Sequence, residues 1–417
     1  MKKVTILISL LLLMATYSIS FADDLNLTAE SAILADVDTG QILYEKNPHL
    51  KLHPASTTKI MTGILAIELG NPNDIVTVND ETPYIIKGSH IALEPGEQLS
   101  LDDLIHALLI ESANDSALVI ANHIAGSTEK FVKLMNEKAK ELGAMDTNFT
   151  NPHGLTDENH LTTAYDLYLM AKYAMENEIF REIVSNYTYT IPPTNKKSES
   201  RYLKSENKLL YSTEKINVDG NLVPIKYDGA NGIKTGYTTE AGNCLVASVE
   251  KNNRRLIAVA LKSNGKEVFA DIHKLFNYGF HNFQNVNVAN ENEFVDNFKV
   301  ENGTIPFVAG IVKNNLICSI PIDSSDEITK KVILNEELKA PIEKGQAIGK
   351  IEYYLDDNLL GTVDIISTMA IEKNNLSMFL HQIIGKWYIV VLFLVVVARA
   401  YIVMKKRRKK KYRKAYF

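Results

Sequence analysis

The apolar residues in the first part of the chain change from a strand spacing to a helix spacing. Two apolar stretches, 31–37 and 41–44, flank the turn Asp38-Thr39-Gly40 and predict a β-hairpin. After Ser56 the apolar residues recur every three or four positions until Gly70-Asn71-Pro72, which is a helix stop signal. This spacing predicts a buried helix after the hairpin.

The pattern continues as helices and then returns to strands. It predicts two helices, two strands and a last helix, in the segments 99–124, 128–142, 244–249, 255–261 and 271–280. The first of these segments is interrupted at 112–114, where Ser and Asn favour a tight turn. Because helices are inserted between two groups of strands, we expect an antiparallel sheet with helices packed on it, an α/β (α+β) fold, over residues 23–283.

From residue 284 onward the apolar residues lie in short alternating segments. These segments are 305–312, 317–320, 350–355 and 360–366. The last two flank the turn Asp356-Asp357-Asn358, as in a hairpin. We expect a small all-β domain over 284–370 that serves as a spacer or platform, because no group of catalytic residues occurs there.

The N-terminus has the pattern of a secretory signal. Met1-Lys2-Lys3 precedes an apolar stretch, and Ser20-Phe21-Ala22 forms a small-x-small site. This pattern predicts a signal peptide over 1–22 that is cleaved after Ala22, and an uncleaved anchor is the alternative.

The C-terminus has a second apolar run, over 387–404, whose 18 residues are near the minimum for a transmembrane helix. Its one charge, Arg399, is near enough to the end of the run to reach the membrane interface. A basic tail, 405–417, follows directly, and the positive-inside rule places it in the cytoplasm. We therefore expect a single-pass membrane protein whose ectodomain lies outside the cytoplasm, with 371–386 as the linker to the membrane.

Composition and charge narrow the choice of partners. The 417 residues are 46% hydrophobic and 23% charged, an ordinary globular composition with room for two domains. Residues 23–386 hold all 50 acidic residues but only 33 of the 45 basic ones, so we do not expect nucleic acid as a partner. The basic tail abuts an apolar span and is interpreted as a topology signal instead. Cys244 and Cys318 are too few for a disulfide scaffold, and we expect two separate buried thiols.

Three short motifs occur in a fixed order along the chain. They are Ser56-Thr57-Thr58-Lys59, Ser112-Ala113-Asn114 and Lys234-Thr235-Gly236. The first has little weight alone, because further S-x-x-K matches begin at Ser127, Ser205, Ser212, Ser248 and Ser263. Only the copy at Ser56 lies upstream of both Ser112-Ala113-Asn114 and Lys234-Thr235-Gly236. That ordered set is typical of penicillin-recognising serine enzymes.

The first two motifs can support acyl transfer. Ser56 and Lys59 are three residues apart, so a helix would project them from one face. Burial and the nearby charge of Lys234 would lower the pKa of Lys59 and make it a base for the Ser56 hydroxyl. Ser112 can relay a proton to a leaving amine, and Asn114 can bind a substrate amide. The alternative for Ser112-Ala113-Asn114 taken alone is simple helix capping.

The third motif can recognise an extended anionic substrate. Lys234 and Thr235 can hold a carboxylate by charge and hydroxyl, and Gly236 lets a substrate backbone approach the strand. The alternative is an ordinary exposed strand end. No metal site or cofactor is predicted, because H-E-x-x-H is absent and His49 and His53 have no accompanying acid.

Longer blocks around these motifs resemble a known family. Segments 54–62, 151–155 and 234–242 are similar to those of the D-alanyl-D-alanine carboxypeptidases, low-molecular-mass penicillin-binding proteins whose catalytic domain resembles that of serine β-lactamases. The resemblance covers 28–282, and 340–345 looks like part of the family's second domain.

The resemblance implies a serine carboxypeptidase that trims the terminal D-alanine from peptidoglycan stem peptides ending in D-Ala-D-Ala and is acylated by β-lactam antibiotics. It implies that Ser56 is the acylated nucleophile and Lys59 its base. The remaining site would comprise Ser112, Asn114, Lys234, Thr235 and Gly236. The backbone N–H groups of Ser56 and Tyr237 would form the oxyanion hole.

The chain departs from the family pattern at one position. Similar sequences often have an arginine that assists carboxylate binding where this chain has Val268, and Lys266, Arg254 or Arg255 are candidates to replace it.

β-Lactamase and transpeptidase activity are the alternatives that share this fold. No E-x-x-L-N occurs between the second and third motifs, which argues against a β-lactamase. Transpeptidation stays open. A non-catalytic peptidoglycan-binding sensor is the alternative from another class, and the intact Ser56 and Lys59 argue against it.

Overall fold

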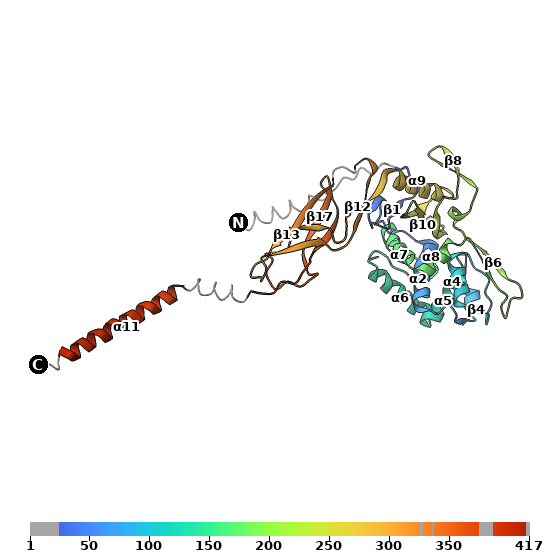
Figure 1. Ribbon diagram of the computed structural model, residues 1–417. Helices are drawn as coiled ribbons and strands as arrows, with labels where there is room; N and C mark the ends of the chain where they lie inside the picture. Colours follow the sequence, from blue (N-terminus) through green and yellow to red (C-terminus); the bar gives the residue numbers. More distant parts are fainter. Residues whose placement is uncertain (1–24, 325–327, 336, 375–386, 414–417) are drawn as a thin grey trace, which may run out of the picture. The chain divides into compact units, whose positions relative to one another are not determined.

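The structure is a computed structural model that describes residues 25–324, 328–335, 337–374 and 387–413 (Figure 1). It divides into two compact units, Met1–Asn285 and Val286–Phe417. The predicted signal peptide and most of the predicted linker, residues 375–386, lie outside the described residues.

The first unit is built on a five-stranded antiparallel sheet with the strand order β2-β1-β11-β10-β9. Its strands are β1 Ser31–Asp36, β2 Ile42–Lys46, β9 Ala230–Thr238, β10 Gly242–Lys251 and β11 Arg254–Ser263. β1 and β2 form the predicted hairpin. β1 also pairs with β11, with Ser31 opposite Leu261, so strands from both ends of the unit complete one sheet.

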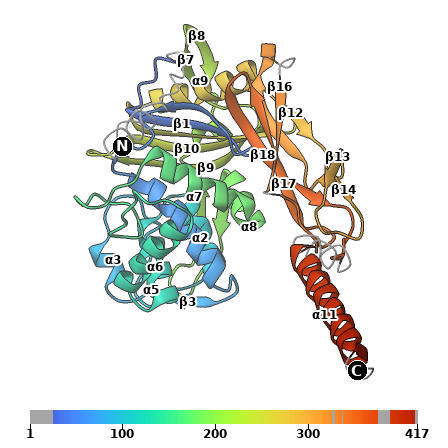
Figure 2. The same ribbon diagram turned by 90° about the vertical axis from the view of Figure 1, so that its left-hand side faces the viewer.

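Alternate residues of the central strands face two different helix layers. In β1, Ile33 and Ala35 belong to the larger core with most of the helices, whereas Ala32 and Leu34 belong to the core under α9 (Figure 2). The helices are α2 Lys59–Leu69, α3 Thr82–Ile85, α4 Leu101–Leu109, α5 Asn114–Ala125, α6 Thr128–Glu141, α7 Ala164–Glu176, α8 Glu178–Ser185 and α9 Glu267–Asn282. The predicted sheet with helices packed on it is confirmed.

Short elements connect these layers. Two 3₁₀ helices, η1 Ala55–Thr58 and η2 Lys208–Leu210, lie beside the sheet strand β9. Three two-stranded antiparallel sheets pair β3 Ile75–Thr77 with β4 Gln98–Ser100, β5 Thr188–Ile191 with β6 Arg201–Lys204, and β7 Lys215–Val218 with β8 Asn221–Pro224. The apolar pattern did not predict these small sheets, because their strands are only three or four residues long and largely exposed.

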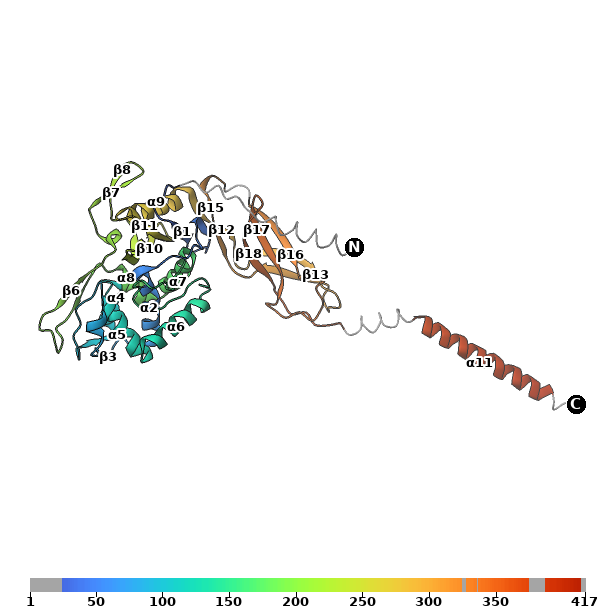
Figure 3. The same ribbon diagram turned by 180° about the vertical axis from the view of Figure 1, so that it is seen from behind.

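The second unit contains an all-β domain, as the alternating segments predict (Figure 3). Its strands are β12 Phe283–Ala289, β13 Phe294–Lys299, β14 Phe307–Val312, β15 Leu316–Pro321, β16 Ile328–Leu334, β17 Ala347–Leu355 and β18 Asn358–Ser367, with a 3₁₀ helix, η3 Ile322–Ser324, before β16. A five-stranded sheet has the order β13-β14-β18-β17-β16, and β12 pairs with β15. Cys318 is buried here and Cys244 in the first unit, so the prediction of two separate thiols is confirmed.

The helix α11, Trp387–Arg413, contains the predicted apolar run and continues into the basic tail. Within its stretch Trp387–Arg408 an 18-residue window has a mean hydropathy of 2.3 and is exposed. This stretch is long and apolar enough to cross a membrane, which fits the predicted anchor.

Candidate active site

Ser56 and Lys59 meet where η1 leads into α2. The Lys59 Nζ atom lies 2.8 Å from the Ser56 Oγ atom. It also donates to the Asn114 Oδ1 atom at 2.6 Å and to the His153 carbonyl oxygen at 2.7 Å. The pair was expected on one helical face, and the structure places the serine in the 3₁₀ turn and the lysine at the first position of the α-helix.

The environment of Lys59 favours its neutral amine. The side chain is completely buried, and this burial is the main cause that lowers the pKa of Lys59 well below the ordinary lysine value. The charge of Lys234 lowers the pKa further, whereas Asp115 opposes the shift. A neutral amine hydrogen-bonded to a serine hydroxyl is the arrangement that a general base requires.

The S-x-N motif lies between α4 and α5. Ser112 occupies the left-handed region of backbone space, with φ of 64°, and Asn114 is the first residue of α5. The Asn114 carboxamide accepts from Lys59 and donates to the Lys87 carbonyl oxygen at 2.6 Å. Its backbone N–H donates to the Ser89 carbonyl oxygen. Asn114 therefore joins the buried lysine to the loop that contains residues 87–89.

The K-T-G motif lies on β9, which packs against η1. Lys234 is buried, and this burial lowers its pKa to about 8, while the carboxylates of Glu206 and Glu111 act in the opposite direction. Gly236 is required for close packing, because a Cβ atom there would lie 2.7 Å from the Ser56 backbone nitrogen.

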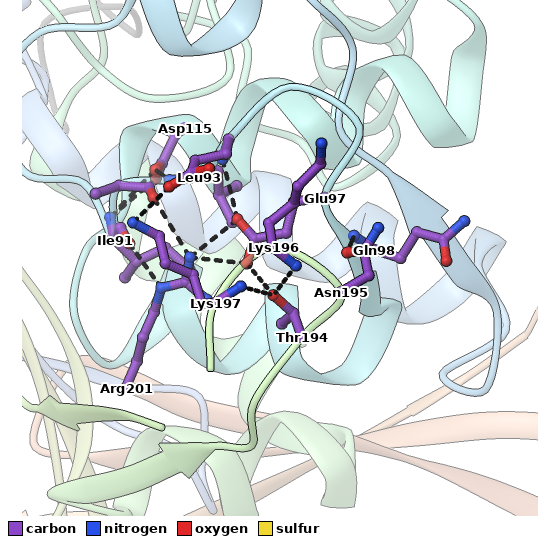
Figure 4. Close-up of polar contacts among 12 residues, drawn as sticks. Ile91, Leu93, Glu97, Gln98, Asp115, Thr194, Asn195, Lys196, Lys197 and Arg201 are labelled. Atoms are coloured by element: carbon purple, nitrogen blue, oxygen red, sulfur yellow. Dashed lines mark hydrogen bonds and ion pairs between the residues drawn. The ribbon is translucent and has the colours of Figure 1, made fainter. Parts of the chain in front are cut away.

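The loop that covers one side of the S-x-N motif is held by two buried carboxylates (Figure 4). Asp115 accepts from the backbone N–H groups of Ile91 and Leu93. Glu97, whose side chain is completely inaccessible, forms an ion pair of 2.8 Å with Arg201 and accepts from Thr194. Sequence reasoning missed these residues, although Asp115 directly follows the S-x-N motif.

Two neutral histidines hold the turn opposite Lys59. Burial lowers the pKa of His153 to about 3 and that of His160 to about 4. His160 Nε2 lies 2.8 Å from the Thr58 hydroxyl, and the His153 carbonyl oxygen accepts a hydrogen bond from Lys59. The contribution of the His153 carbonyl oxygen had no signal in the sequence.

These elements enclose a cleft of about 440 Å³. Of the predicted site residues, six line it: Ser56, Ser112, Asn114, Thr235, Gly236 and Tyr237. Lys59 and Lys234 are buried and do not line the cleft. The structure thus brings all three motifs to one place, from segments far apart in the sequence.

Val268 also lines the cleft, where it contributes an apolar wall. The three cations considered as replacements for an arginine do not line it and are paired elsewhere. Lys266 pairs with Glu214, Arg254 with Asp36 and Arg255 with Asp38.

The fold and the cleft together define a serine peptidase of the penicillin-binding type with a C-terminal β domain. A sequence model of the D-alanyl-D-alanine carboxypeptidases matches residues 18–265, and one of the penicillin-binding protein 5 C-terminal domain matches residues 283–373. The chain belongs to the D-alanyl-D-alanine carboxypeptidase family. The predicted family, fold and enzyme class are therefore confirmed.

Individual relatives agree with this assignment. The chain is 34% identical over 372 residues to D-alanyl-D-alanine carboxypeptidase DacF of Bacillus subtilis, covering 86% of this chain and 90% of the relative. It is 31% identical over 396 residues to DacC of Escherichia coli, with the same coverage. The crystal structure of penicillin-binding protein 5 from Haemophilus influenzae superposes with a TM-score of 0.71 and 28% identity, over 83% of this chain and 98% of that one.

Proposed function

We propose that this protein removes the terminal D-alanine from peptidoglycan stem peptides through an acyl-enzyme on Ser56, and that penicillins acylate the same serine. The observation that carries the proposal is the 2.8 Å distance between the Ser56 Oγ atom and the Lys59 Nζ atom. Ser56 lines the cleft, and burial lowers the pKa of Lys59. The family membership gives the reaction class.

In the proposed first step, neutral Lys59 accepts the Ser56 proton while Oγ attacks the carbonyl carbon of the penultimate D-alanine. The backbone N–H groups of Ser56 and Tyr237 would stabilise the oxyanion, a contribution worth several kcal/mol in other acyl-transfer enzymes. The close packing of Gly236 on the Ser56 nitrogen supports this placement, because it keeps β9 against the nucleophile.

The second step expels D-alanine. The tetrahedral carbon re-forms its carbonyl and the peptide C–N bond breaks. The proton that Lys59 took from Ser56 passes to the leaving amine through the Ser112 hydroxyl, which receives one proton as it gives one up, so Lys59 returns to its neutral form. Lys234 and Thr235 would hold the substrate carboxylate during this step. Water then attacks the Ser56 ester and releases the shortened stem peptide.

Transpeptidation is a second candidate, in which an amine replaces water as the acceptor. The similarity of the fold to a variant of a Streptomyces DD-transpeptidase favours it. The TM-score is 0.56 and the identity 28%, over 61% of this chain and 98% of the transpeptidase. Product analysis with an added acceptor amine separates the two reactions, because hydrolysis yields only the shortened peptide.

We further propose that α11 anchors the protein in the cell membrane, with the catalytic unit outside the cytoplasm and the basic tail inside. The apolar run 387–404 and the basic residues after it support this topology.

The central test compares the wild type with Ser56→Ala. The wild type is expected to be labelled by fluorescent penicillin and to release D-alanine from a peptide ending in D-Ala-D-Ala, whereas Ser56→Ala should do neither. Mass spectrometry should locate the penicilloyl group on the peptide that contains Ser56. Labelling without release of D-alanine would favour a sensor, and a penicilloyl group at Ser127 or Ser212 would disprove the assignment.

The pH dependence of kcat/KM tests the two buried lysines. Deprotonation of Lys59 should raise the acylation rate as the pH increases, since only the neutral amine accepts a proton. Lys234 has a pKa of about 8, so its ammonium charge, and with it the binding of a carboxylate, should be lost as the pH rises through that value. We expect a bell-shaped profile for an acid peptide. The same descending limb with a peptide ending in D-alaninamide would contradict the role of Lys234.

A further inference from the structure

The lining of the cleft contains two charged side chains among the described residues, Glu206 and Lys208. Lys59 and Lys234 lie buried beneath the surface, and Lys234 is close to neutrality at slightly alkaline pH. The cation that an anionic substrate meets on the cleft surface is therefore Lys208.

The backbone of Lys208 is fixed beside the K-T-G strand. Lys208 is the first residue of η2, and buried Asn207 caps this turn by accepting from the Leu209 N–H at 3.2 Å. The Asn207 Nδ2 atom donates to the Gly232 carbonyl oxygen of β9 at 2.9 Å. These bonds tie the position of Lys208 to the strand that bears Lys234, Thr235 and Gly236.

The ammonium group of Lys208 shares its partner with a second lysine. Glu214 lies 2.8 Å from the Lys208 Nζ atom and 2.6 Å from the Lys266 Nζ atom. Hydrogen bonds from these lysines lower the pKa of Glu214 to about 2, so the carboxylate stays ionised. Two ammonium groups for one carboxylate leave an excess positive charge. Lys208 can turn to a substrate while Lys266 continues to neutralise Glu214.

We propose that Lys208 is a specificity-determining residue that, together with Lys234 and Thr235, binds the terminal carboxylate of the substrate in a cleft where Val268 provides no charge. This inference rests on the proposed function, since it names the group that selects a peptide acid. Glu206 should increase the loss of affinity when Lys208 is replaced, because its negative charge on the cleft lining would then repel the substrate carboxylate.

The test measures peptide binding in a Ser56→Ala background, where no reaction occurs. A peptide ending in D-Ala-D-Ala is compared with the same peptide ending in an amide, by calorimetry on the full chain. Lys208→Gln should weaken binding of the acid about tenfold and leave the amide unchanged, as expected for one lost charge contact. Lys208→Arg should retain the preference for the acid.

Lys266→Gln is the matched control, because it also removes a partner of Glu214 but does not line the cleft. Because it leaves Lys208 as the remaining lysine partner of Glu214, Lys266→Gln should weaken binding of the acid clearly less than Lys208→Gln does, and it should leave the amide unchanged. Equal weakening of acid and amide by Lys208→Gln, or an equal effect of Lys266→Gln, would overturn the proposal.

A second measurement keeps the two proposals separable. With Ser56 intact, labelling by a penicillin, which carries a carboxylate, should be about tenfold slower in Lys208→Gln and clearly less affected in Lys266→Gln. Unchanged labelling of Lys208→Gln would count against Lys208. Failure of the wild type to release D-alanine would instead count against the proposed function, since neither the binding nor the labelling comparison depends on that release.

Discussion

Replacing Lys59 by methionine is expected to lower the rate of penicillin labelling and of D-alanine release by about 10³-fold, the usual contribution of a positioned general base. Ser56 would remain in the cleft, but the base 2.8 Å from its hydroxyl would be lost. Single-turnover labelling with fluorescent penicillin, followed over hours, measures the residual rate.

The chain provides a matched control for this variant. Lys130 ends another S-x-x-K match, the one that begins at Ser127, and lies on the exposed side of α6. Lys130→Met should label at the wild-type rate. If Lys59→Met retained more than about a tenth of the wild-type rate, well above the loss expected for a missing base, Lys59 would not be the base.

Replacing Glu97 by alanine is expected to destabilise the first unit by about 3–5 kcal/mol, because it leaves the guanidinium of Arg201 largely buried without its carboxylate. The same change removes the acceptor for Thr194 and for the Glu94 N–H. Chemical denaturation followed by far-UV circular dichroism measures the loss of stability.

Two comparisons identify the cause of that loss. Glu94→Ala removes a neighbouring but exposed ion pair, with Lys197, and should change the stability far less than Glu97→Ala does. The double variant Glu97→Leu/Arg201→Met should recover much of the stability lost in Glu97→Ala, because no unpaired charge remains. A loss in Glu97→Ala no larger than that in Glu94→Ala would contradict the importance of the buried pair.

The motifs that carry chemistry were visible in the sequence because they are local. A spacing of three residues was enough to bring Ser56 to Lys59, even though the pair spans the junction of a 3₁₀ turn and an α-helix. The interruption at 112–114 was also predicted, because Ser and Asn favour such turns, and the structure has Ser112 at positive φ.

The partners of Lys59 could not be predicted in the same way. The His153 carbonyl oxygen is a backbone atom, and every residue has one, so no residue type marks its role. The Asn114 carboxamide was expected to face the substrate, but in the structure Lys59 and Lys87 occupy both of its ends. Orientation depends on the surrounding loop, which the motif does not encode.

Long-range ion pairs were equally hidden. Arg201 lies among polar residues and resembles a surface residue, yet it pairs with Glu97, which is 104 positions earlier. Similarly, Arg254 and Arg255 are adjacent to an apolar strand and were candidates for the cleft, but Asp36 and Asp38 of the first hairpin bind them. Such pairings follow from the sheet order, which the sequence pattern alone leaves undetermined.

The pairing of β1 with β11 has a consequence for the way the chain reaches its folded state. Ser31 cannot pair with Leu261 until the more than 200 residues between them have been synthesised. Contacts between residues so far apart in the sequence form slowly. Until then the β1–β2 hairpin has one unsatisfied edge and an uncovered apolar face, and an isolated hairpin is marginally stable in water. We therefore expect the first unit to remain largely unfolded until its strands β9 to β11 are available, and an unfolded chain would suit the transfer across the membrane that the proposed topology requires.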